Sequence, residues 1–468
     1  MAVVVLLADG VRPDTLAAAI DAGALPALAR LRDEGAMHTV STVFPSVTGP
    51  AYAPFLMGRF PGPVGLPGLR WFDRERAACA FPDYTRSYVG YQMGAVDRDI
   101  APGAPTIFEL APSSLAALSV ITRGLPPANR IGAITLRSAV RAARTHFSGN
   151  VAGWLDIDRE VGDEVVRRVA ADRPAYTYAA FTGVDKVSHA RGHAHPMVTD
   201  ALRIVDDAAA RIRADAERDG RWAEMQLWIV SDHGHSPVTA HEDLAGLLGR
   251  LGHRVVAHPW VFTPMPQTAV MVSGNAMAHV YLEVRRRARP WWPALRGQWE
   301  GLAALLLSRP SVDLAMLPVD AGRCEVRSRR GDVGMVSRTG GRYSYSPVTG
   351  DPLGIGRALE GVTADEAHEA TIGTDYPDSV VQIAHLAASP RTGDIVLSAS
   401  REWDFRARYE PIPHVSSHGA LHREHMMVPL LVNRPVARPP RRTTDVMPSS
   451  LAALGLPIPP SLDGTSFL

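Results

Sequence analysis

The stretch Gln226-Leu-Trp-Ile-Val-Ser-Asp-His-Gly234 decides the fold class of this 468-residue chain. It joins a short, mostly apolar run directly to polar residues that can take part in catalysis. The N-terminal run Val3–Ala8 ends in the same way, at Asp9. This pattern is typical of buried strands in a parallel sheet, in which ligands bind beyond the carboxyl ends of the strands.

The rest of the chain repeats this pattern. Tyr176–Phe181 is a third apolar run, and it leads into Thr182-Gly-Val-Asp185. Val428–Val432 is a fourth, with His418 shortly before it. Between such runs, Met197–Ile212 places apolar residues at helical spacing. Strands that alternate with helices predict an α/β fold with a mostly parallel sheet sandwiched by helices.

Residues 241–387 have a different character. They contain β-rich pieces such as Ala278–Val284, a hairpin candidate at Met335–Tyr345 around two glycines, and one helix near Trp292–Leu307. This mixture predicts a smaller α+β unit inserted into the main domain.

The insertion divides the chain into two expected parts. Residues 1–240 and 388–468 form the core, and residues 241–387 form a cap that covers the site and selects the substrate. We expect the chain to return to the core sheet near Asp394–Leu397.

Composition excludes several classes of function. Hydrophobic residues make up 46%, which a large globular core requires. Lys plus Arg is 49 against 48 for Asp plus Glu, so charge does not favour a nucleic-acid partner. The two cysteines form no CxxC pair.

The N-terminal apolar run lacks the basic residues of a signal peptide, and no run reaches the roughly 20 apolar residues of a membrane span. We therefore expect a cytoplasmic protein without a membrane partner; its oligomeric state stays open.

Carboxylates and imidazoles gather around the predicted strand ends: Asp9, Asp185, His189, Asp232, His233 and His418. Asp185 and His189 are four residues apart, so they share one side of a helix. A mixed set of oxygen and nitrogen ligands suits Zn²⁺ first, with Mn²⁺ or another divalent ion as the alternative. Six side chains exceed the needs of one ion, and two ions can share them.

The segment Phe44-Pro-Ser-Val-Thr48-Gly-Pro50 supplies a candidate nucleophile. Pro is favoured in the first turn of a helix, so Thr48 is expected as the N-cap residue at a helix end that attracts phosphate. The hydroxyl of Thr48 becomes a good nucleophile when a bound metal ion holds it as an alkoxide.

These motifs resemble those of the type I phosphodiesterase/nucleotide pyrophosphatase family of the alkaline phosphatase superfamily. Asp9-Gly-Val-Arg-Pro-Asp14 resembles its opening metal motif, and Phe44–Pro61 resembles its nucleophile helix. Asp185-Lys-Val-Ser-His189 is similar to its Asp-x-x-x-His pair, and Ser231-Asp-His-Gly234 and Ser417-His-Gly419 complete the family's order. The resemblance implies an alkaline-phosphatase-like core.

The resemblance also implies roles for individual residues. One metal ion would be held by Asp9, Thr48, Asp232 and His233, and the second by Asp185, His189 and His418. Thr48 would attack phosphorus and form a phosphoryl-enzyme intermediate, which water at the second ion would release. His235, His422 and His425 flank these motifs and are not counted among the ligands.

One position departs from the family pattern. Diesterases of the family carry an Asn that donates to a phosphate oxygen, and the matching position here is Leu69. Loss of one such donor costs on the order of 10²–10³ in rate, so a substitute is expected. The N–H of Gly49 and the side chain of Arg70 are the candidates for binding substrate in its place.

The expected function is hydrolysis of a phosphodiester or pyrophosphate bond in a small phosphorylated substrate. A phosphomonoesterase or phosphonate hydrolase with the same metal centre is the alternative, and a catalytically weak metal-binding module is a further one. A sulfatase is disfavoured because Thr48-Gly-Pro-Ala-Tyr52 lacks the Arg of the sulfatase motif.

Overall fold

The computed structural model describes residues 1–76, 84–132, 136–259, 261–406 and 414–468. Its main sheet has seven strands: β1 Ala2–Ala8, β2 Ala36–Ser41, β5 Ser114–Ala117, β6 Arg130–Ile131, β7 Tyr176–Phe181, β8 Met225–Val230 and β21 Met427–Val432. Their order across the sheet is β2-β21-β8-β1-β7-β5-β6. The four strands expected from the apolar runs are therefore neighbours or near neighbours at the centre of the sheet.

The direction of the strands explains where the polar residues gather. Strand β1 pairs in parallel with β7 and β8, and β5 pairs in parallel with β6 and β7. Among the described strands of this sheet, β21 alone runs in the opposite direction, antiparallel to β2 and β8. The beginning of β21 therefore lies at the edge where β1, β7 and β8 end. Residues shortly before β21 reach the same edge as residues directly after the other three.

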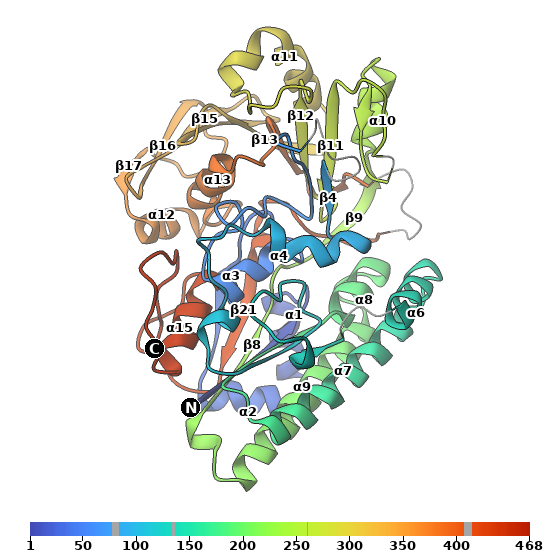
Figure 1. Cartoon of the computed structure of the whole chain (residues 1–468). Coiled ribbons are helices and arrows are strands. Elements are labelled where there is room, and N and C mark those ends of the chain that lie inside the picture. The colour runs from blue at the N-terminus through green and yellow to red at the C-terminus, as the bar shows by residue number, and fades with distance from the viewer. Residues whose placement is uncertain (77–83, 133–135, 260, 407–413) are drawn as a thin grey trace.

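Helices cover both faces of this sheet (Figure 1). In β1, Val4 and Leu6 pack into one apolar core and Val3 and Val5 into another, as the alternation of side chains along a strand requires. The first core contains α1 Pro13–Asp21, α2 Pro26–Glu34, α7 Val151–Asp172, α8 Gly183–Arg191 and α9 Pro196–Arg218, and the second contains α3 Ala53–Met57, α5 Ile107–Leu110 and α15 Val446–Ala453. The prediction of a mostly parallel sheet sandwiched by helices is confirmed.

The other α-helices of the described chain are α4 Val96–Asp99, α6 Leu136–Phe147, α10 Leu244–Arg250, α11 Trp292–Leu307, α12 Ala364–Thr371, α13 Ser379–Ala388 and α14 Arg423–Met426. The helix expected near Trp292–Leu307 is thus present. No helix in the described ranges combines the length and the apolar character that crossing a membrane requires.

A second, nine-stranded sheet lies beyond the main sheet, in the upper part of Figure 1. Its strands, in spatial order, are β10 Val255–Val256, β11 Thr268–Ser273, β12 Met277–Leu282, β18 Ile395–Ala399, β13 Val312–Pro318, β14 Arg323–Ser328, β15 Val333–Thr339, β16 Arg342–Thr349 and β17 Leu359–Val362. Apart from the parallel pair β10 and β11, neighbouring strands are antiparallel. The hairpin expected around Gly340-Gly341 is formed by β15 and β16.

One expectation about the path of the chain is wrong. The segment Asp394–Leu397 does not return to the main sheet, because β18 pairs with β12 and β13 in the middle of the second sheet. All five residues of β18 are buried. A short apolar run shows that a strand is buried, but it carries no information about the sheet that the strand joins. The chain rejoins the main sheet at β21.

Two small sheets connect these parts. Strands β19 Glu402–Asp404, β9 Ser236–His241 and β20 Ser416–Ser417 form a three-stranded sheet in that order, and β3 Arg70–Phe72 pairs with β4 Thr85–Ser87. Strand β9 begins shortly after β8, and β20 comes directly before His418. Their pairing therefore brings His418 to the carboxyl edge of the main sheet.

Candidate metal centre and nucleophile

All seven side chains expected as metal ligands meet at the carboxyl edge of the main sheet. Asp9 follows β1, Asp185 and His189 lie on α8 after β7, Asp232 and His233 follow β8, His418 follows β20, and Thr48 lies in the loop after β2. They form two adjoining clusters, which the stacked rings of His233 and His418 connect at a centroid distance of 3.7 Å.

The carboxylate-rich cluster consists of Asp9, Thr48, Asp232 and His233. His233 Nε2 lies 3.1 Å from Thr48 Oγ1, 3.3 Å from Asp9 Oδ1 and 3.5 Å from Asp232 Oδ2. Thr48 Oγ1 lies 3.2 Å from Asp9 Oδ1. The carboxylates and the imidazole are buried, whereas Thr48 is partly exposed. The hydroxyl is therefore the member of this cluster that a substrate can reach.

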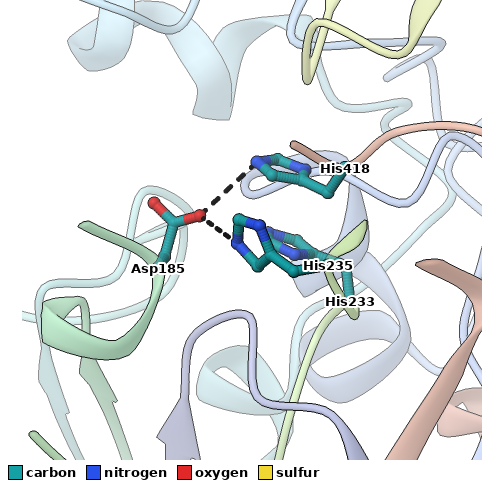
Figure 2. Close-up of side chains that lie close together, drawn as sticks. All are labelled: Asp185, His233, His235 and His418. Carbon is teal, nitrogen blue, oxygen red and sulfur yellow. Dashed lines mark hydrogen bonds and ion pairs between the residues drawn. The ribbon is translucent and has the colours of Figure 1, made fainter. Parts of the chain in front are cut away.

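The histidine-rich cluster consists of Asp185, His189, His235 and His418. Asp185 Oδ1 lies 3.0 Å from His235 Nε2, 3.2 Å from His189 Nε2 and 3.5 Å from His418 Nε2. Figure 2 shows the carboxylate of Asp185 facing the rings of His235 and His418 from the opposite side. Ligand-type atoms of Asp185, His235, His418 and the neighbouring His233 all lie within 4.8 Å of one another.

Hydrogen bonds at Nδ1 determine which ring nitrogens face inward. Nδ1 of His189 lies 2.9 Å from the carbonyl oxygen of Ser416, and Nδ1 of His418 lies 3.0 Å from that of Ser46. A carbonyl oxygen can only accept, so both Nδ1 atoms donate, and a neutral ring then carries a lone pair on Nε2. The two Nε2 atoms lie 3.2 Å apart. Two lone pairs at that distance repel each other unless a cation lies between them, which is the usual arrangement of metal-binding histidines.

Electrostatics in the carboxylate-rich cluster also favour a cation. Burial and the charge of Asp9 raise the pKa of Asp232 well above its ordinary value. Burial opposes protonation of His233, but Asp232 and Asp9 outweigh it and raise the pKa of His233 to about 9. Oδ2 of Asp232 accepts no hydrogen bond from the part of the chain that the structure describes. Two buried carboxylates side by side need compensating positive charge to ionise together, and a divalent ion provides it.

The histidine-rich cluster has the opposite balance. Burial works to raise the pKa of Asp185, but the charges of His189 and Lys186 outweigh it and hold this pKa well below its ordinary value. Burial and the nearby His233 hold the pKa of His418 well below its ordinary value. An ionised carboxylate with imidazoles around it is the donor set that binds a divalent transition metal. Both clusters therefore fit a metal ion.

The structure corrects the expected role of Thr48 at the helix start. The chain enters a 3₁₀ turn at Pro50–Tyr52, and Gly49, not Thr48, is the residue that precedes it. Gly49 has φ of 97°, a conformation that a β-branched residue avoids. The turn continues into α3, which has no side-chain cap. Because Thr48 is not used as a cap, its hydroxyl is directed at Asp9 and His233.

The two candidates for binding substrate, Gly49 and Arg70, lie on different segments. A Cβ atom on Gly49 would lie 3.9 Å from Leu69 Cδ1, so Leu69 packs beside the loop that carries Thr48. Arg70 lies at the start of β3, where its Nε donates to Ser87 Oγ at 3.3 Å. The apolar side chain of Leu69 thus occupies the neighbourhood in which a phosphate-binding donor was expected.

His235 is the member of the site that sequence reasoning missed. It is fully buried in the histidine-rich cluster, and a Cβ on Gly10 would lie 2.9 Å from its ring. The available signal was its position directly after Asp232-His-Gly234. Both ring nitrogens of His425 are bonded within the protein: its Nε2 lies 2.8 Å from Ser236 Oγ, and its Nδ1 accepts from Ala420 N at 3.0 Å.

Comparison with known proteins gives two findings from sequence. A family model described as type I phosphodiesterase/nucleotide pyrophosphatase matches residues 3–299. This range includes every expected ligand except His418. A search of curated proteins finds no match.

Solved structures show the same fold at low sequence identity. Phosphonoacetate hydrolase from Sinorhizobium meliloti 1021, in complex with phosphonoformate, aligns with a TM-score of 0.58 and 17% identity over 97% of this chain and 96% of that chain. An inactive threonine-to-alanine variant of murine ectonucleotide pyrophosphatase/phosphodiesterase 5, in complex with AMP, aligns with 0.55 and 15% over 98% and 96%. The human protein of that name aligns with 0.58 and 13% over 99% and 97%. The alkaline-phosphatase-like fold is confirmed.

Proposed function

The chain belongs to the type I phosphodiesterase/nucleotide pyrophosphatase family, and from this premise we propose that it is a two-metal hydrolase of phosphodiester or pyrophosphate bonds with Thr48 as its nucleophile. One observation carries the proposal: Thr48 Oγ1 lies within 3.2 Å of both His233 Nε2 and Asp9 Oδ1, in a cluster that suits a divalent cation. Zn²⁺ is the expected ion at both clusters, with Mn²⁺ as the alternative.

The reaction divides between the two clusters. When bound, the two ions supply positive charge for the Thr48 alkoxide and for the phosphoryl oxygens. Asp9 and His233 orient Thr48 Oγ1, which forms a bond to phosphorus while the bond to the leaving alcohol or phosphate breaks. Water then attacks phosphorus on the side of Asp185, His189 and His418, and the bond to Thr48 breaks to release phosphate or a phosphate monoester. The inactive threonine-to-alanine variant of the murine relative supports this role of Thr48.

A second candidate has specific support. Leu69 cannot donate a hydrogen bond to a diester oxygen, and it lies beside Gly49. One structural relative is a phosphonoacetate hydrolase. Hydrolysis of a phosphonate or a phosphate monoester by the same metal centre is therefore the alternative, and Gly49 N–H and Arg70 are the proposed phosphate-binding groups.

We further propose that residues 241–387, together with β18 of the same sheet, act as the cap that selects the substrate. The turn between β11 and β12 lies against the site: Ser417 Oγ donates to Gly274 O at 3.0 Å, and Asn275 pairs with His418 through the backbone. A Cβ on Gly274 would lie 2.9 Å from the carbonyl oxygen of His418. The second sheet thus adjoins the residues expected to hold the second ion.

A rate screen tests the function. The protein, loaded with Zn²⁺ or Mn²⁺, is assayed on p-nitrophenyl phosphate, bis-p-nitrophenyl phosphate, a dinucleoside pyrophosphate and phosphonoacetate. We expect turnover to be fastest on the diester or the pyrophosphate. Fastest turnover of phosphonoacetate or of the monoester favours the second candidate. Two bound ions without turnover of any of these compounds would indicate a metal-binding module instead.

A further inference from the structure

His235 makes two contacts that together define its chemistry. Its Nε2 lies 3.0 Å from Asp185 Oδ1, and its Nδ1 lies 3.2 Å from Ser416 Oγ. The side chain is fully buried. It therefore presents Nε2 to the same carboxylate oxygen that faces His189 and His418.

The hydroxyl of Ser416 decides which nitrogen of His235 carries a proton. Ser416 Oγ lies 2.9 Å from the carbonyl oxygen of Ser236, which can only accept. The single hydroxyl proton is therefore given to Ser236, and Ser416 Oγ accepts from His235 Nδ1. In the neutral ring, Nε2 then has a lone pair that faces an oxygen of Asp185. This is the arrangement already found for His189 and His418, whose Nδ1 atoms also donate to fixed oxygens.

Four of the six separations among the four donor atoms fit one ion. Zinc in a tetrahedral site has bonds of about 2.0–2.1 Å to nitrogen and oxygen, so its ligand atoms lie about 3.3–3.4 Å apart. Asp185 Oδ1 lies 3.0, 3.2 and 3.5 Å from Nε2 of His235, His189 and His418, respectively. Nε2 of His189 and of His418 are 3.2 Å apart. Each of these separations is close to an edge of such a tetrahedron.

We infer that His235 is a fourth protein ligand of the ion at the histidine-rich cluster, beside Asp185, His189 and His418. The inference rests on the proposed function to the extent that it requires a bound ion. With four protein ligands in place, a phosphate oxygen or water enters as a fifth ligand, and the ion is retained more tightly than by three residues.

The test compares His235→Gln with His425→Gln in the full-length protein. Gln at position 235 retains a hydrogen-bonding group near Asp185 but is a poor ligand for zinc. His425 is the matched control, because both of its ring nitrogens are bonded within the protein. Zn²⁺ affinity is measured by chelator competition. We expect one of the two ions to bind about 100-fold more weakly in His235→Gln and both to bind normally in His425→Gln.

X-ray absorption at the zinc edge gives a second, independent measurement. The wild-type protein with two zinc ions is expected to show four coordinating imidazoles per chain, from His189, His233, His235 and His418. A count of three in the wild type, or unchanged affinity in His235→Gln, overturns the inference and leaves the proposed function standing. A wild-type protein that binds neither Zn²⁺ nor Mn²⁺ would contradict the proposed function itself. If His235→Gln does not fold, the wild-type imidazole count decides.

Discussion

The two clusters differ in how the chain builds them. Most of the carboxylate-rich cluster follows directly from strand ends, with Asp9 after β1 and Asp232-His233 after β8. The histidine-rich cluster is assembled from the first and second turns of α8, the loop before β9 and the residue after β20. A site made from strand ends depends on local sequence pattern, whereas one made from several elements depends on how those elements pack. The difference teaches that the members of the carboxylate-rich cluster could all be expected from local sequence, whereas His235 in the histidine-rich cluster could not.

The clusters also differ in charge, which suggests different tasks. Asp9, Asp232 and an ionised Thr48 together carry more charge than one divalent ion neutralises, so that side of the site would keep no spare positive charge once an ion is bound. Asp185 alone opposes the second ion, and positive charge remains there to attract phosphoryl oxygens. Substitutions on the two sides should therefore have distinct effects.

The largest effect is expected from Asp232→Ala, which breaks the carboxylate-rich cluster. It removes a buried carboxylate that is expected to be a ligand, so one of the two ions should be lost and turnover should fall by about 10⁴ or more. Elemental analysis and assays of the best substrate measure both. Asp207→Ala on the exposed side of α9 is the control, and it should change neither value. Retention of two ions by Asp232→Ala would contradict the ligand assignment.

Thr48→Ala is expected to separate chemistry from metal binding. Loss of the hydroxyl removes the nucleophile, so turnover should fall about 10³-fold while both ions remain, because the other expected ligands are intact. Thr48→Ser should keep part of the activity. Assays and elemental analysis of the same samples check this. A near-normal rate in Thr48→Ala would show that a water molecule is the true nucleophile.

Leu69→Asn is expected to have a smaller effect, on catalysis alone. The new amide would lie beside the Thr48 loop and donate to a phosphate oxygen, so diester turnover should rise about 10-fold. The measurement is kcat for bis-p-nitrophenyl phosphate. Leu69→Gln is the control, because its amide is equally polar but lies one methylene group further from the backbone. No change in Leu69→Asn would mean that the reacting phosphate binds elsewhere.

The smallest effect concerns the anchoring of the histidine-rich cluster. Asp158 on α7 accepts hydrogen bonds from Gly183 N at 2.6 Å and Thr182 N at 3.1 Å, at the start of α8. Burial raises the pKa of Asp158 to about 7, whereas an unfolded Asp titrates near pH 4. The folded state holds this proton more tightly, so stability from Asp158 is present at low pH and is lost as pH rises from about 4 to about 7.

Asp158→Asn removes the pH dependence of stability that Asp158 causes, and it keeps a hydrogen-bond acceptor at this position. In the metal-free protein, the Tm of Asp158→Asn minus the Tm of the wild type should increase by about 2 °C or more as pH rises from about 4 to about 7. Thermal melts at several pH values measure it, and Asp163→Asn on the exposed side of the same helix serves as control. A constant Tm difference from pH 4 to pH 8 would show that Asp158 does not titrate in this range.

The sequence by itself determined the parallel sheet and the seven expected ligands. The information is local: an apolar run such as Val3–Ala8 specifies a strand buried on both faces, and a polar residue that follows it must lie at the carboxyl edge. The four-residue spacing of Asp185 and His189 is equally local. Even the position of His418 at this edge was predictable, because it precedes a strand in the sequence.

Only the tertiary structure decided the rest, because it depends on contacts between residues far apart in the chain. The apolar sequence of β18 predicts a buried strand, but it does not show that the strand pairs with β12 and β13. The sequence around Thr48 suggested a cap, but the φ of 97° at Gly49 moved the helix start by one residue. His235 joined the site because β9 pairs with β20 and because Gly10 leaves space for its ring. The partners of β18 and the place of His235 follow from packing between distant segments, which no local pattern of residues encodes.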